Sequence, residues 1–187
     1  MTLKGKTAVI TGSNSGIGLG VAEELARAGA DVVINSFTDS AEDHALAARI
    51  AAGHGVKARY IQADMSKPDD CRALVEKAGG CDILVNNAGI QFVKTVALET
   101  AGQSITCNAV CPGYVLTPLV EAQIPDQMKV HDMDRETVIR EVMLQRQPSR
   151  QFATTEQIGG TVVWLCSPFA DQVTGTTISV DGGWTAL

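Results

Sequence analysis

Long apolar runs, clustered cysteines and an excess of positive charge are all missing from this chain of 187 residues. No apolar run approaches the roughly 18 residues that a transmembrane helix needs. The formal net charge of −6 argues against bulk electrostatic binding to nucleic acid or to an anionic membrane. The first residues lead directly into an apolar strand pattern and lack the layout of a signal peptide, so we expect a cytoplasmic protein.

Metal-binding patterns and phenol groups are also scarce. The five cysteines include no C-x-x-C pair, and the three histidines stand isolated in polar stretches, so we expect free cysteines and no metal site. Only two tyrosines occur, Tyr60 and Tyr114, and no other residue could supply a phenol as an acid or base.

What the sequence does contain is a regular alternation of short apolar runs and helical stretches. Such alternation indicates a parallel sheet covered by helices on both faces. We therefore predict a single doubly wound, Rossmann-like α/β domain over residues 1–187, with about six strands in one parallel sheet and a helical lid around residues 117–150. Strands are expected over 6–10, 31–35, 58–62, 82–86, 105–110 and 176–180, and helices within 15–30, 41–52, 68–78 and 155–166.

A glycine-rich segment, TGSNSGIG, lies between the first strand and the first helix, with Thr11, Gly12, Gly16 and Gly18 at fixed spacing. Gly12 allows a tight turn, Gly16 lets the backbone approach a pyrophosphate, and Gly18 allows the helix to pack closely on the strand. The helix N-terminus adds free N–H groups and partial positive charge. A plain glycine turn is the simpler alternative, but the strand–loop–helix context favours a dinucleotide site.

Further motifs follow the later strands in a fixed order. Asp64-Met65 follows the third strand, NNAG follows the fourth at residues 86–89, CPGYVLTP spans residues 111–118, and DGG spans residues 181–183. Together with the T-G-x-x-x-G-x-G spacing, this order resembles the short-chain dehydrogenase/reductase family, and the resemblance extends from residue 6 to residue 184. Carried over by motif, the cofactor contacts would be Thr11, Gly12, Ser15, Gly16, Ile17, Gly18, Asp64, Met65, Asn87, Ala88, Gly89, Pro112, Gly113, Val115 and Thr117.

The expected cofactor is NAD rather than NADP. A 2′-phosphate would need Arg or Lys beside the glycine loop or just after the second strand. The chain has Asn14-Ser15 in the loop and Asn35-Ser36-Phe37-Thr38-Asp39 after the strand, without a cation in either place.

The resemblance also implies a substrate and an assembly. Several segments resemble family members that interconvert 3-hydroxybutyrate and acetoacetate, and a small carboxylate of this kind would contact Gln91, Tyr114, Gln123 and Trp184. Amide N–H groups can donate to a carboxylate, and aromatic walls exclude water. The glutamines could instead be solvated loop residues and Trp184 could be core packing. Members of the family assemble as tetramers, so a homodimer or homotetramer is implied.

One part of the family pattern is missing. Hydride transfer needs a general acid/base at the hydroxyl oxygen. The family uses Ser, Tyr and a Lys four residues after the Tyr, but no Y-x-x-x-K occurs here. About 60–70 residues, or two strand–helix units, would be lost near residues 92–94, and strand 105–110 would then lie beside strand 83–86.

Two interpretations remain open: an oxidoreductase with impaired activity, or a non-catalytic NAD-binding or interaction module. Tyr114 with Lys94 is the only substitute acid pair that the sequence offers.

Overall fold

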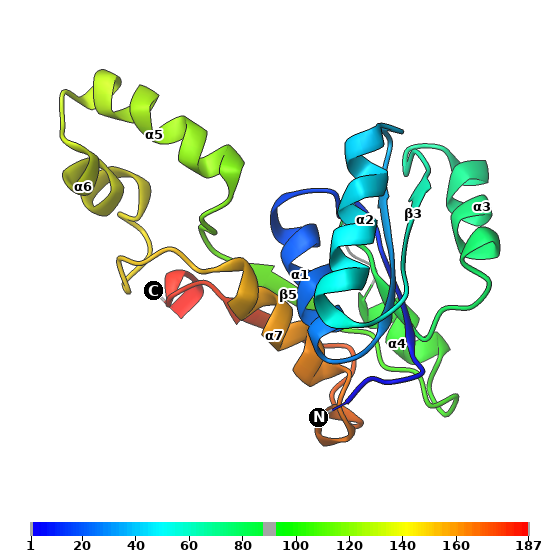
Figure 1. The fold of residues 1–187 in the computed structure, drawn as a ribbon. Helices are drawn as coiled ribbons and strands as arrows, with labels where there is room; N and C mark the ends of the chain where they lie inside the picture. Colours follow the sequence, from blue (N-terminus) through cyan, green and yellow to red (C-terminus); the bar gives the residue numbers. More distant parts are fainter. Residues whose placement is uncertain (1, 88–92, 187) are drawn as a thin grey trace.

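The computed structural model describes residues 2–87 and 93–186 and contains six parallel strands in two sheets (Figure 1). The four-stranded sheet has the order β3-β2-β1-β4, which is the first part of the Rossmann order 3-2-1-4-5-6. The strands are β1 (Thr7–Ile10), β2 (Asp31–Ser36), β3 (Ala58–Gln62) and β4 (Ile83–Val85), with β5 (Ala109–Pro112) and β6 (Thr177–Val180) forming the second sheet. An α/β fold with parallel, Rossmann-like strands is therefore confirmed.

Several helices begin or end at recognisable capping residues. Ser40 and Asp43 form a capping box at the start of α2, and Gly55 ends that helix in the left-handed conformation. Thr117 caps α5, whose first residue is Pro118. The helices are α1 (Gly16–Arg27), α2 (Ala41–His54), α3 (Pro68–Ala78), α4 (Val93–Glu99), α5 (Pro118–His131), α6 (Arg135–Val138) and α7 (Thr155–Leu165), with short π and 3-10 turns η1 (Ile139–Met143), η2 (Pro168–Ala170) and η3 (Trp184–Ala186).

The larger part of the core lies under α1, α2 and α7. Their apolar side chains pack against one face of β1 and β2, while Leu74 and Ala78 of α3 pack against the other face. Helices α1 and α7 lie side by side (Figure 1) and touch through small residues. A Cβ at Gly20 of α1 would stand 2.4 Å from Cβ of Thr155 in α7, so only glycine permits this close contact.

The predicted single sheet is wrong. No ladder joins β4 to β5 among the described residues, and the fifth strand begins at Ala109 instead of residue 105. Leu84 of β4 shows the consequence: its neighbour Val9 on β1 is fully buried, but Leu84 is 51 % exposed. Among the described strands β4 lies at the edge of its sheet, and the helices that normally cover the faces of a parallel sheet leave half of the Leu84 side chain exposed.

Residues 118–143 form an arm that projects away from both sheets (Figure 1). Its helices α5 and α6 and the π-turn η1 enclose a small core of Ile124, Val138 and Met143. This arm is the segment for which we expected a helical lid, and helices do fill it.

No helix in residues 2–87 and 93–186 is long and apolar enough to cross a membrane. The same residues contain no cluster of three or more potential metal ligands, and all five cysteines are free.

Candidate functional site

The glycine loop between β1 and α1 is held against the end of β2. The Ser13 N–H donates to the Asn35 carbonyl at 2.7 Å, and the Asn35 N–H donates to Oγ of Ser13 at 2.9 Å. The Gly12 N–H lies 3.4 Å from Oδ1 of Asn35, and Gly12 has a positive φ of 60°. The turn therefore needs glycine, and strand β2 fixes its position.

Asn87, which follows β4, closes the loop from the other side. Its Nδ2 donates to the Gly12 carbonyl at 2.9 Å and to the Thr11 carbonyl at 3.2 Å. A Cβ at Gly18 would stand 2.3 Å from the Gly12 oxygen and 2.8 Å from Nδ2 of Asn87. Strands β1 and β4 flank the point where the strand order reverses, which is where ligands bind in open α/β sheets.

The first turn of α1 has the donors that a pyrophosphate requires. No hydrogen bond of the described residues uses the N–H groups of Gly16, Ile17 and Gly18, and the first bonded amide is that of Leu19. Ser15, the N-cap, makes no side-chain capping bond and is exposed. Free amides, an uncommitted hydroxyl and the positive end of a helix dipole fit the phosphates of a dinucleotide.

The segment after β5 reaches the same loop. A Cβ at Gly16 would lie 3.8 Å from Cγ2 of Thr117, which places Thr117 beside the helix N-terminus. Val115 is buried and forms a β-bridge with Ala153. Pro112 ends β5, and a Cβ at the following Gly113 would stand 2.8 Å from Cα of Asp181. The structure thus brings Thr117 to the glycine loop, whereas Gly113 contacts Asp181 and Val115 pairs with Ala153.

Tyr114 and Trp184, two of the four predicted substrate residues, lie together. Their ring centroids are 5.9 Å apart, and the ring centroid of Phe152 lies 6.4 Å from that of Tyr114. Asp181 holds the turn before Trp184, since its carboxylate accepts the N–H groups of Gly183 at 3.0 Å and Thr185 at 2.9 Å. An aromatic wall therefore stands beside the cofactor segment.

Other predicted residues are not brought into this arrangement. Gln123 is exposed on α5, in the projecting arm. The carboxylate of Asp64 accepts from the N–H of Ser66 at 3.0 Å and from its Oγ at 2.7 Å, so it caps its own turn next to Met65. The predictions for Ala88, Gly89 and Gln91 fall outside the described residues.

Two buried polar residues were not found from the sequence. Gln147 is 1 % exposed, and its Oε1 accepts the Tyr114 N–H at 3.1 Å. Asp43 of α2 is 6 % exposed, and its Oδ1 accepts from Nδ2 of Asn14 in the glycine loop at 3.0 Å. The Asn14 amide, followed by the Ser40 backbone, lowers the pKa of Asp43 from 3.8 to about 2. Neither contact has a signal in local sequence, because each joins segments about 30 residues apart.

The two phenols are placed differently. The Tyr60 hydroxyl is buried, donates to the carbonyls of Ser36 and Thr38, and has its pKa raised by burial. Tyr114 belongs to the aromatic wall. Lys94 is exposed on α4, and no hydrogen bond among the described residues joins it to Tyr114. The described residues thus include no assembled Tyr–Lys pair.

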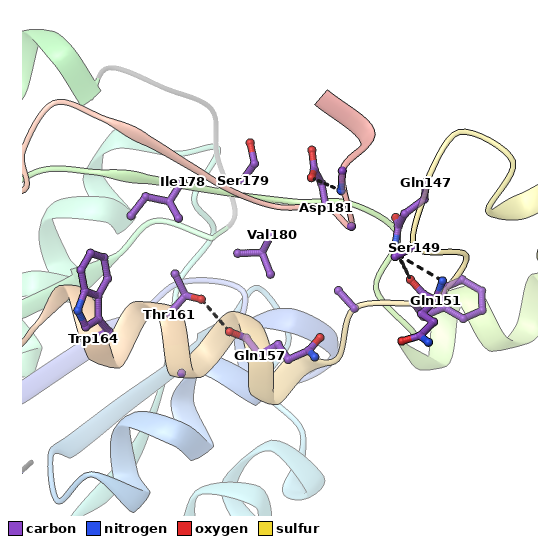
Figure 2. A pocket seen from close by; sticks show the side chains of 15 residues that line it. Gln147, Ser149, Gln151, Gln157, Thr161, Trp164, Ile178, Ser179, Val180 and Asp181 are labelled. Carbon is purple, nitrogen blue, oxygen red and sulfur yellow. Dashed lines mark hydrogen bonds between the residues drawn. The ribbon is translucent and has the colours of Figure 1, made fainter. Parts of the chain in front are cut away.

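A separate groove of about 820 Å³ lies between α7 and β6. Figure 2 shows Thr161 and Trp164 on α7 facing Ile178 and Val180 of β6. Its far end is lined by the DGG turn and by Gln147, Ser149, Gln151, Phe152 and Ala153. The groove runs along β6, which pairs only with β5 among the described strands.

These features define a class of protein. Residues 6–91 match the family described as short chain dehydrogenase, and residues 90–185 match the family described as Enoyl-(Acyl carrier protein) reductase. The chain belongs to the short-chain dehydrogenase/reductase family.

Within this family, the chain is similar to two bacterial D-beta-hydroxybutyrate dehydrogenases. It is 38 % identical to the protein of Rhizobium meliloti (97 % of this chain, 99 % of the relative) and 35 % identical to that of Cupriavidus necator (98 % and 99 %). It also superposes on the crystal structure of L-sorbose reductase from Gluconobacter frateurii, complexed with NADPH and L-sorbose. The TM-score is 0.91 at 26 % identity, over 100 % of this chain and 99 % of that one.

The alignment with the Rhizobium meliloti protein extends over 255 positions, although the chain has 187 residues. At least 68 positions, the difference between 255 and 187, therefore lie opposite gaps in this chain. The two family matches meet at residues 90–91. This agrees with the prediction of an internal deletion near residues 92–94.

Proposed function

We propose that this chain binds NAD at the switch point between β1 and β4, with the pyrophosphate on the first turn of α1. The observation that carries the proposal is that the N–H groups of Gly16, Ile17 and Gly18, close to Asn87, have no acceptor among the described residues. The relative solved with NADPH supports a nicotinamide cofactor, and the absence of Lys and Arg from residues 11–18 favours NAD.

The proposed substrate is a small carboxylate such as 3-hydroxybutyrate or acetoacetate. The names of two relatives support this class, and the aromatic wall of Tyr114 and Trp184 would shield such a molecule from water. Gln123 would contact the substrate only if the arm folded back over the aromatic wall, so the arm of residues 118–143 is the proposed lid.

The proposed turnover is low or absent. A bound NAD would supply the hydride acceptor for oxidation of an alcohol, but the hydroxyl proton would still have to pass to a general base of the protein. The Tyr60 hydroxyl is hydrogen-bonded to two backbone carbonyls, and no lysine among the described residues is hydrogen-bonded to Tyr114. We therefore propose an impaired oxidoreductase of the 3-hydroxybutyrate type, and a non-catalytic NAD-binding module as the second candidate.

Binding without turnover is the first expected result. Titration with NADH, followed by nicotinamide fluorescence, is expected to give saturable binding, and adding acetoacetate is expected to cause no NADH oxidation above the rate without protein. Reduction above that rate would contradict the proposed loss of activity, and the Tyr114→Phe variant would then show whether Tyr114 is the acid. Failure to bind NADH would contradict the nucleotide site itself.

We further propose a homodimer formed through α7 and the free edge of β6. Strand β6 pairs only with β5 among the described strands, and Trp164 in the adjacent groove is 42 % exposed. An unpaired strand edge beside exposed apolar side chains favours association of two copies. The complete family assembly of four subunits is the alternative.

Light scattering is expected to give the mass of a dimer, and the Trp164→Glu variant is expected to be a monomer with unchanged NADH binding, because a charge there would lie inside the interface. The matched control is Phe169→Glu, which changes another exposed aromatic outside the groove. A monomeric wild-type protein would rule out this interface.

A further inference from the structure

A buried carboxylate lies directly behind the glycine loop. Asp43 lies on the first turn of α2, and one of its carboxylate oxygens accepts a hydrogen bond from Nδ2 of Asn14 at 3.0 Å. Its other oxygen accepts three hydrogen bonds: from Oγ1 of Thr38 at 2.8 Å, from the Ser40 N–H at 3.1 Å and from the Ser40 hydroxyl at 3.0 Å. Four donors hold this one side chain, which therefore stays ionised at neutral pH.

The network decides which groups Asn14 can offer to a ligand. Its amide nitrogen has two hydrogens. One is donated to the Asp43 carboxylate, and the other points to Oγ1 of Thr38, which lies 3.4 Å from Nδ2. Both donors are therefore used, and the amide oxygen, which has no bond among the described residues, is the group left over. The Thr38 hydroxyl has its shortest bond, 2.8 Å, as a donor to Asp43. Its oxygen accepts from Asn14 and lies 3.4 Å from Oγ of Ser36, so Thr38 offers a ligand lone pairs and no free donor.

The position of this network corresponds to the adenosine end of a bound dinucleotide. Asn14 belongs to the loop that would hold the pyrophosphate, and Thr38 lies just beyond β2, where dinucleotide-binding domains contact the ribose 2′ position. Ordinarily a carboxylate at the end of the second strand makes that contact. Here residues 36–38 are Ser, Phe and Thr, and the carboxylate comes from the following helix.

We infer that Asp43 selects NAD over NADP by leaving only acceptor atoms on Asn14 and Thr38 and by placing a fixed negative charge behind them. This inference rests on the proposed NAD binding. A ribose 2′-hydroxyl can donate to such acceptors, whereas a 2′-phosphate is an acceptor with about two negative charges at neutral pH and is repelled. Asp39 and Glu42 add negative charge to this segment, and no Lys or Arg occurs in residues 36–48. His44 is the one group there that could be cationic, and it pairs with Asp39.

The test compares dissociation constants for NADH and NADPH, both measured by nicotinamide fluorescence. The wild-type protein is expected to prefer NADH at least about tenfold, and Asp43→Asn is expected to reduce that ratio by about tenfold, mainly through tighter NADPH binding. In this variant the Asn14 amide can turn its oxygen toward the new side-chain amide and present N–H groups to a phosphate.

Asp39→Asn is the matched control. It removes the same charge from the same segment, but the Asp39 side chain is 65 % exposed and bonds to His44, not to the glycine loop. Its NADH/NADPH ratio is expected to change less than about twofold. If Asp43→Asn does not fold, as judged by circular dichroism, Asp43→Ser replaces it, because a hydroxyl can still accept the Ser40 N–H.

Three outcomes would overturn the inference. A wild-type protein that binds NADPH as tightly as NADH contradicts the selectivity but leaves dinucleotide binding intact. An unchanged ratio in the Asp43 variant, with NADH still bound, assigns the selectivity to other residues. A wild-type protein that binds neither dinucleotide overturns both this inference and the proposed function.

Discussion

Replacing Gly18 by alanine is expected to lower NADH affinity by roughly 10–100-fold and to destabilise the folded chain by about 1–3 kcal/mol. The added Cβ would stand 2.3 Å from the Gly12 carbonyl oxygen, a distance that no relaxed structure allows. The clash involves backbone on one side and the Asn87 amide on the other, so the loop must shift as a whole. Fluorescence titration with NADH and thermal unfolding measure the two effects.

The control for this variant is Gly53→Ala. Gly53 lies inside α2, and a Cβ there has nothing within 4 Å, so alanine is expected to leave NADH binding unchanged and to raise stability slightly. Normal NADH binding by Gly18→Ala would show that the pyrophosphate does not use this loop.

The second large effect is expected where α7 crosses α1. Two consecutive glycines of α7 face different surroundings: a Cβ at Gly159 would lie 2.5 Å from Cγ of Glu24 and 3.0 Å from the Gly20 carbonyl, whereas a Cβ at Gly160 has nothing within 4 Å. Gly159→Ala is therefore expected to destabilise by about 1–3 kcal/mol through overpacking. Gly160→Ala is expected to stabilise by about 0.5–1 kcal/mol, because alanine favours the helical backbone.

Urea unfolding of the two variants under identical conditions gives this comparison directly. Because both substitutions add the same methyl group to the same helix, helix propensity cancels and only the contact with α1 differs. Equal stability of the two variants would mean that α1 and α7 are not in close contact.

Most helices and strands were predicted correctly, because apolar periodicity and capping residues are signals within the segment itself. Helix α3 begins at Pro68 as expected, and β3 has the predicted bounds of 58–62. The fifth strand was misplaced because the start of a strand depends on its neighbour. Among the described strands β5 pairs only with β6, beginning at Ala109, so Ile105 remains outside the strand and is 50 % exposed. Periodicity cannot reveal which partner a strand will have.

The predictions for the site also succeed where the signal is local and fail where it depends on distant segments. The spacing of the glycines and the order of the motifs predicted a site at the loop and at the segments after β4 and β5, and the structure places Asn87 and Thr117 beside that loop. The role of Asp43 depends on Asn14, 29 residues earlier in the chain, so no spacing within α2 indicates it. Gln123 was assigned through resemblance, but α5 carries it out on the arm. Only the packing of whole elements decides such positions.

The division of the strands into two sheets affects how cooperatively the domain unfolds. A two-stranded sheet is marginal by itself, so β5 and β6 depend on α7 resting against α1. Local opening would therefore release the C-terminal half, including Thr117, before the half that contains the glycine loop. A dinucleotide spanning both halves would bind only the closed form and, by mass action, would stabilise the C-terminal half against local opening.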